Sequence, residues 1–348
     1  MRDPIKICNQ TINAGTRKTL EIPVPNLYTH TELELPVHVI HGKQPGPILF
    51  LSAAIHGDEI NGVEIIRRVL NTKSLAKLKG TLIAIPVVNI YGFINQTRYL
   101  PDRRDLNRSF PGSEKGSLAG RMANLFLNEI VSKCTHGIDL HTAAMHRENF
   151  PHIRAYLDDE DTEQMARAFT SPLILNTDII EGSLRKSAEK LGVSVIVYEA
   201  GEALRFDEVS IRAGVRGITS VMRNLGMLST LKNKRKPTNP IVARSSNWVR
   251  APQSGILRVQ KSLGTRVELN ESLGFVSDPF GEVEEEIISP TDGIIIGRTN
   301  IPLVNEGEAL FHIAQFKSPQ TAANKVESFQ HKMDPATDIK TPEEPPIL

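Results

Sequence analysis

The chain has 348 residues, of which 40% are hydrophobic and 23% are charged, and its formal net charge is +1. This length favours two domains, and the near-neutral balance of interspersed charges argues against nucleic acid as a partner. The two distant cysteines, the lack of a signal peptide and the lack of an apolar run near the roughly 20 residues that span a bilayer predict a soluble cytoplasmic protein with no membrane partner.

The first 225 residues predict alternating strands and helices. Residues 1–40 alternate apolar and polar residues in short pieces, which is typical of antiparallel strands. Short apolar runs predict strands buried on both faces at 48–55, 82–88, 137–143 and 193–201. Apolar residues at helical spacing predict one helix that begins at Asn61 and four further helices at 118–133, 161–170, 182–190 and 207–225. We expect Asn61 and Asp207 to cap their helices. The alternation predicts an α/β fold with a mostly parallel or mixed sheet between two helix layers.

The pattern changes after residue 240. From Trp248 to Phe316 short apolar pieces alternate with glycine and proline, and segment 251–257 resembles segment 289–295, so we predict a small all-β unit of two related halves. A basic, proline-rich stretch at 232–240 reads as a solvated linker. We therefore divide the chain into an α/β domain (1–240), an all-β unit (245–317) and a polar tail (318–348) that we expect to be disordered or loosely attached.

Three residues after apolar strands form a candidate metal site. His56 and Glu59 directly follow the run at 48–55, and His141 lies near the end of the stretch at 137–143. Open α/β sheets bind ligands at the carboxyl ends of their strands. Two histidines and one glutamate are a known ligand set for catalytic zinc, with a fourth position open for water. We predict one Zn²⁺ per chain, although these ligands also suit cobalt, nickel or manganese, and His-x-x-Glu alone also fits a surface loop.

A hydrolase with such an ion needs a base for the attacking water. Glu199 ends the apolar strand at 193–198 and is the first candidate. Glu202 is the second. Either residue alone also fits a solvated loop acid.

Such an enzyme also needs cations for the substrate and the oxyanion. The loop at 97–112 carries four arginines. Arg108, beside Asn107, would bind a substrate carboxylate through its planar fork, and Arg98 or Arg104 would stabilise the oxyanion. The alternative is that neighbouring aspartates in this loop merely neutralise the arginines.

Four motifs in this order resemble the succinylglutamate desuccinylase/aspartoacylase family, a branch of the zinc carboxypeptidase-like hydrolases: HGDE (56–59), DLNRSFPG (105–112), DLHTA (139–143) and YEAGE (198–202). The resemblance covers about 45–225. It implies a carboxypeptidase-like α/β/α sandwich with a mixed eight-stranded sheet.

The resemblance also implies roles for single residues. The metal ligands would be His56, Glu59 and His141, the substrate carboxylate would bind Asn107 and Arg108, and Glu199 would be the general base. Arg98 matches the arginine that polarises the oxyanion, while two extra residues before DLNR keep Arg104 as the alternative.

The all-β unit resembles a barrel-sandwich domain of the biotinyl/lipoyl-like kind. Its hairpin tip, SDPFGEVEEE at 277–286, lacks a lysine, so we expect neither lipoylation nor biotinylation. We expect the unit to cover or narrow the mouth of the active site.

These features favour a zinc-dependent hydrolase that removes the acyl group from an N-acyl amino acid or a related small carboxylate. A metallocarboxypeptidase acting on peptides and a non-catalytic metabolite-binding protein are the alternatives. The sequence leaves the acyl group, the amino acid and the oligomeric state open, a homo-oligomer included.

Overall fold

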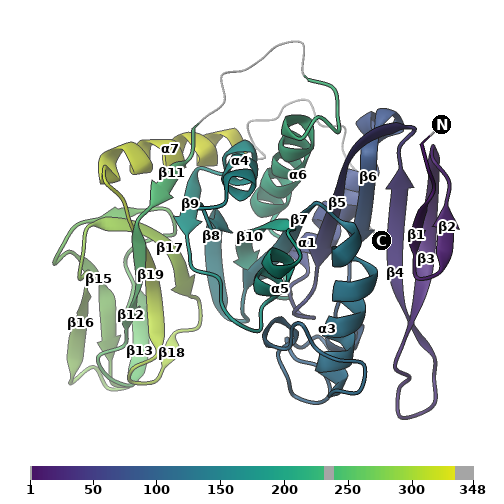
Figure 1. The fold of residues 1–348 in the computed structure, drawn as a ribbon. Coiled ribbons are helices and arrows are strands. Elements are labelled where there is room, and N and C mark those ends of the chain that lie inside the picture. Colours follow the sequence, from purple (N-terminus) through teal and green to yellow (C-terminus); the bar gives the residue numbers. More distant parts are fainter. Residues whose placement is uncertain (1, 231–238, 334–348) are drawn as a thin grey trace, which may run out of the picture.

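The computed structural model describes residues 2–230 and 239–333 (Figure 1). The basic residues at 232–236 and the end of the predicted tail, 334–348, lie outside the described residues.

One mixed sheet of 13 strands runs through the molecule. Ten of these strands follow in the order β12-β19-β17-β8-β10-β7-β5-β6-β4-β3, and the other three, β9, β11 and β14, pair beside this path. Its α/β part contains eight strands: β3 (Thr16–Val24), β4 (Leu33–His41), β5 (Gln44–Ala53), β6 (Lys79–Ile85), β7 (His136–Ala143), β8 (Arg147–Ala155), β9 (Leu173–Asn176) and β10 (Ser194–Glu202). The central strands β6, β5, β7 and β10 are parallel, and β4 and β8 flank them in antiparallel pairing. Their apolar residues are almost all buried, as both faces of the strands are covered.

Helices cover both faces of this sheet (Figure 1). One hydrophobic core lies under α1 (Asn61–Leu70), α4 (Glu160–Ala168) and α6 (Glu208–Asn224). A second core lies under α3 (Leu118–Glu129) and α5 (Leu184–Lys190), and includes the antiparallel pair β1 (Ile5–Ile7) and β2 (Gln10–Ile12). The short helix α2 (Ile90–Ile94) and the 3-10 turns η1 (Lys73–Lys77), η2 (Leu106–Arg108) and η3 (Val131–Lys133) complete this part. The predicted α/β/α sandwich with a mixed sheet is confirmed.

Of the two predicted helix caps, one is wrong and one is confirmed. Asn61 is the first residue of α1 and does not cap it; its side chain instead accepts from the backbone N–H of Asp207 and donates to the carbonyl of Ala200. Asp207 does cap α6, since its carboxylate accepts from the N–H of Ser210. The sequence patterns also gave no sign of β8 and β9.

The C-terminal part is all-β, as predicted, with strands β11 (Ile241–Ala243), β12 (Ser245–Arg250), β13 (Gly255–Val259), β14 (Arg266–Val267), β15 (Ser272–Ser277), β16 (Glu284–Ile288), β17 (Gly293–Thr299), β18 (Leu303–Val304) and β19 (Ala309–Gln315). A four-stranded antiparallel sheet, β16-β15-β13-β18, shares one core with β12, β17 and β19. The described residues form no closed barrel. Because β17 pairs with β8, this unit continues the central sheet. The boundary near residue 240 therefore stays a proposal.

The predicted disordered tail is wrong for its first half, since α7 (Pro319–Met333) is a helix (Figure 1). Ala322, Val326, Phe329 and Met333 recur at helical spacing and are buried in the core that contains α6. The ring of Phe329 meets that of Phe150 edge to face, with the ring centroids 5.9 Å apart. One apolar stripe outweighs the polar composition of the segment. No helix within the described residues has both the length and the apolar character needed to cross a membrane.

Candidate active site

His56, Glu59 and His141 meet at the carboxyl ends of β5 and β7, which are adjacent and parallel. Nδ1 of His56 lies 2.6 Å from one oxygen of Glu59, and Nδ1 of His141 lies 2.8 Å from the other. All three residues are buried, and one ligand atom from each lies within 4.8 Å of the others. Gly57 is needed in this turn, because a Cβ there would stand 2.0 Å from the backbone carbon of Gly92.

Each imidazole is held from behind by a second carboxylate. Nε2 of His56 lies 3.1 Å from Asp105, and Nε2 of His141 lies 2.7 Å from Asp139. In the tautomer in which Nε2–H donates to its carboxylate, the lone pair of Nδ1 faces Glu59. Metal-binding histidines are held by carboxylates in this way.

The charges of the cluster match this arrangement. Burial lowers the pKa of His141, but Asp139 and Glu59 outweigh burial, so the pKa lies well above its ordinary value. Burial raises the pKa of Glu59, yet the two imidazoles outweigh it and hold the pKa well below its usual range. Two lone pairs and one carboxylate that face each other need positive charge between them, which either two protons or a divalent cation supplies. The cluster is therefore compatible with a metal site.

Glu199 lies directly beside this cluster, since it pairs with His141 across β10 and β7. Glu199 is 9% exposed, and its carboxylate accepts a hydrogen bond from Nδ2 of Asn149 at 3.0 Å. Arg154 lies 3.4 Å from its other oxygen. Glu202 instead accepts from the N–H of His146 and from Asn300, and it does not line the cavity. Of the two candidate bases, only Glu199 faces the cluster.

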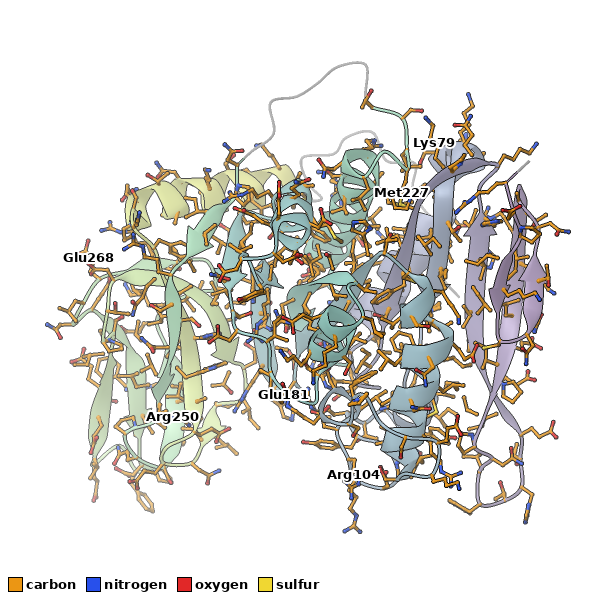
Figure 2. All side chains as sticks on the ribbon, in the orientation of Figure 1. Lys79, Arg104, Glu181, Met227, Arg250 and Glu268 are labelled. Atoms are coloured by element: carbon orange, nitrogen blue, oxygen red, sulfur yellow. The ribbon has the colours of Figure 1, made fainter. Side chains whose placement is uncertain are left out.

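The arginine loop divides between the cavity and the surface. Arg98 lines the cavity, 3.2 Å from Glu59 and 3.0 Å from Asp105. Asn107 and Arg108 also line it, and the side-chain oxygen of Asn107 accepts from the N–H of Leu184 at 2.9 Å. Arg104 does not line the cavity, and its side chain extends away from the body of the protein (Figure 2). Of the two candidates for the oxyanion, Arg98 is the one that the cavity supports.

The cavity has a volume of about 390 Å³ and contains residues that the sequence reasoning missed. They are Arg147, Asn149 and Arg154 from β8, Arg185 from α5, and Trp248 from β12. The strand β8 had no recognisable alternation, so its residues gave no signal. Arg185 did give one, because a cation in the first turn of a helix opposes the helix dipole and needs a reason.

Arg185 is a half-buried cation that forms no ion pair within 4.0 Å with a carboxylate of the described residues, although Glu199 and Asp139 attract it from farther away. Its guanidinium donates to Oγ1 of Thr177 at 3.3 Å and to the carbonyl of Asp178 at 3.2 Å. Burial and the neighbouring Arg154 lower its pKa to about 10. Arg154 places a second positive charge beside this loosely paired guanidinium, so this position favours an anion from outside the protein.

The chain is similar to several known proteins. A curated relative, the N-alpha-acetyl-L-2,4-diaminobutyric acid deacetylase of Halomonas elongata, is 24% identical over 296 residues, which cover 81% of this chain and 85% of the relative. A succinylglutamate desuccinylase/aspartoacylase structure from Rhodobacter sphaeroides is 23% identical with a TM-score of 0.77, and covers 90% of this chain and 97% of its own. The product-bound ectoine utilization protein EutE (DoeB) of Ruegeria pomeroyi is 22% identical with a TM-score of 0.77, and covers 90% of this chain and 96% of its own.

The family model of the succinylglutamate desuccinylase/aspartoacylase catalytic domain matches residues 45–225, more than half of the chain. That range holds the histidine–glutamate cluster, the arginine loop and Glu199. The chain therefore belongs to the succinylglutamate desuccinylase/aspartoacylase family.

Proposed function

We propose that this protein is a zinc-dependent amidohydrolase that removes the acyl group from a small N-acyl amino acid. The observation that carries the proposal is the cluster of His56, Glu59 and His141, whose imidazoles face Glu59 while second carboxylates hold them in place. Glu199 and several arginines line the same cavity. Family membership supports the same class of reaction.

His56, Glu59 and His141 would hold the ion, and two nitrogens with one carboxylate suit zinc. When bound, such an ion acts as a Lewis acid toward the acyl carbonyl and makes water acidic enough to lose a proton near neutral pH. Asp105 and Asp139 keep the imidazoles in the tautomer that presents Nδ1.

Glu199 would take the proton of the attacking water and return it to the leaving nitrogen. Its neighbours support this role, because Asn149 fixes one carboxylate oxygen while Arg154, at 3.4 Å, leaves the other less tightly held. Arg98, close to Glu59, would place positive charge near the oxygen on which negative charge develops.

The substrate should carry at least one carboxylate besides the amide. Asn107 and Arg108 would bind the carboxylate of the amino acid, as a guanidinium and a carboxylate form a bidentate pair. Arg185, which forms no close ion pair among the described residues, and Arg154 nearby favour a second negative group. The Halomonas relative is named for a diaminobutyric acid derivative, whose side chain is cationic. Because several arginines line the cavity of this chain, we propose that its own substrate is acidic.

A test compares amine release from N-acetyl and N-succinyl derivatives of aspartate, glutamate and diaminobutyrate, together with C-terminal cleavage of short peptides. We expect hydrolysis of the acidic N-acyl amino acids, loss of activity with a chelator and recovery with Zn²⁺. Peptide cleavage alone would favour a carboxypeptidase, and binding without hydrolysis would favour a metabolite-binding protein.

Glu199→Gln separates the base from the metal ligands. Because Glu199 is not among the three ligands, the variant should lose turnover by at least about 100-fold and keep its metal. His141→Ala is the matched control, and its metal content should fall sharply. Loss of metal in Glu199→Gln, or full metal in His141→Ala, would contradict the assignments.

A further inference from the structure

Trp248 brings the C-terminal unit into the active site. It is the only tryptophan of the chain, and it lines the same cavity as the histidine–glutamate cluster. Among the described residues that line the cavity, Trp248 is the sole member of the C-terminal unit, and neither Phe nor Tyr lines it. Its side chain is partly exposed, so its surface is available to a ligand.

A row of residues across four strands ties Trp248 to the proposed base. Trp248 on β12 pairs with His312 on β19, His312 pairs with Gly297 on β17, and Gly297 pairs with Asn149 on β8. Asn149 in turn donates to Glu199. A Cβ on Gly297 would stand 3.0 Å from Asn149 and 3.1 Å from His312, so the glycine lets the two flanking side chains approach.

The indole is held in a fixed orientation. Its ring stacks on that of His312 with centroids 4.5 Å apart and an interplanar angle of 7°. Burial and Arg154 lower the pKa of His312 to about 4, so the imidazole is neutral near pH 7. The guanidinium carbon of Arg147 lies 5.6 Å from the centre of the indole, within the range of a cation–π contact. These contacts make Trp248 a rigid surface that does not have to be ordered when a ligand binds.

The carboxylate-binding residues come from another group of elements. The loop that carries Asn107 and Arg108 packs on the start of α5, through bonds from the N–H of Leu184 to Asn107 and from the N–H of Phe110 to the carbonyl of Gly182. Trp248 and Arg147 come from β12 and β8. An amide that places its amino acid against the loop directs its acyl group toward the remaining wall. The cavity volume of about 390 Å³ falls in the range of pockets for drug-sized ligands, which leaves room beyond an acetyl group.

We propose that Trp248 determines acyl specificity, with its indole packing against the carbon chain of an acyl group longer than acetyl. This inference rests on the proposed function for the identity of the ligand. Each additional methylene packed in an apolar pocket contributes about a tenfold or larger preference. Trp248 therefore favours a longer chain over acetyl on the same amino acid.

The kinetic test measures kcat/KM for N-acetyl, N-butyryl and N-succinyl derivatives of one amino acid with the full-length protein. Trp248→Ala should reduce the butyryl-to-acetyl ratio of kcat/KM by about tenfold or more, and Trp248→Phe should recover part of it. A decrease in the succinyl-to-acetyl ratio alone would overturn the apolar contact and assign the selectivity to Arg147. Phe280 belongs to the same unit and is 87% exposed, so the control variant Phe280→Ala should leave all ratios unchanged.

Tryptophan fluorescence gives a second readout that needs no turnover. As Trp248 is the only tryptophan, its emission should change when N-acyl amino acids are added to the Glu199→Gln variant, with tighter apparent binding for butyryl than for acetyl. Emission changes without hydrolysis by the wild type would reject the proposed function and support the contact. Hydrolysis with no emission change and unaltered ratios in Trp248→Ala would overturn the inference alone, and neither hydrolysis nor emission change would overturn both.

Discussion

Asp139 offers a sharp test of the metal site, because it touches a proposed ligand without being one. Its Oδ2 accepts from Nε2 of His141 at 2.7 Å, and its Oδ1 accepts from Oγ of Ser52 at 2.7 Å. Asp139 is 1% exposed, so water cannot replace either bond. In Asp139→Asn one of the two acceptors becomes an NH₂ group. If that group faces His141, it donates to Nε2, and the proton moves to Nδ1, where it blocks the lone pair that faces Glu59.

We expect Asp139→Asn to bind Zn²⁺ about 10- to 100-fold more weakly, the range for lost carboxylate support of a histidine ligand. This loss corresponds to about 1.4–2.8 kcal/mol at 1.4 kcal/mol per tenfold. A competition titration with a chromogenic chelator measures it, and circular dichroism checks that the variant is folded. The control is Ser52→Ala, which removes the bond to Oδ1 but leaves the carboxylate against His141, and its affinity should change far less. Wild-type affinity in Asp139→Asn, or an equal loss in Ser52→Ala, would refute the reasoning.

Three further predictions address the rest of the molecule. Arg185→Leu should lower kcat/KM for acidic substrates by about 10- to 150-fold, the range for a lost charged hydrogen bond, without lowering the melting temperature; equal losses for neutral substrates would contradict an anion site. Burial lowers the pKa of His152 to about 3, so between about pH 6.5 and pH 3 only the unfolded chain takes up this proton. The free energy of unfolding, measured in urea, should therefore decrease as the pH is lowered through that window. His152→Leu should flatten this slope, whereas the exposed His30→Gln should not. Gly297→Ala should lower kcat while Zn²⁺ affinity by chelator competition stays unchanged, because its Cβ crowds Asn149 and not the metal ligands; weaker Zn²⁺ binding would contradict this.

The fold was predictable where one physical signal dominated. The strands β5, β6, β7 and β10 are short runs with buried apolar residues on both faces, a pattern that survives without tertiary information. The strand β8 carries Asn149, His152 and Arg154 in place of such a run, since it faces the cavity and the C-terminal unit. Its strand character comes from pairing with β10 and β17, which no local pattern reports. The helix α7 was missed because its stripe of apolar residues is sparse within a polar segment.

The site was predictable to the extent that its residues follow strands or sit in recognisable motifs. His56, Glu59, His141 and Glu199 stand at the carboxyl ends of parallel strands, and parallel neighbours bring such positions together. Arg98 could not be separated from Arg104 by sequence, because only the path of the loop places one inside and the other on the surface. Arg185 and Trp248 come from elements whose positions depend on the assembled sheet.

The continuity of the sheet decides how the C-terminal unit can act. We expected it to cover or narrow the mouth of the site, and a hinged lid would be one way to do so. The backbone pairing of Gly297, Arg298 and Thr299 with β8 joins the unit to the strand that holds Asn149. Swinging the unit outward would break those main-chain bonds, each worth about 0.5–1.5 kcal/mol, and expose their polar groups. It would also draw β8 away from Glu199. The unit therefore forms a fixed wall of the cavity, and we propose that selectivity comes from the shape and charge of the cavity and not from closure around the ligand.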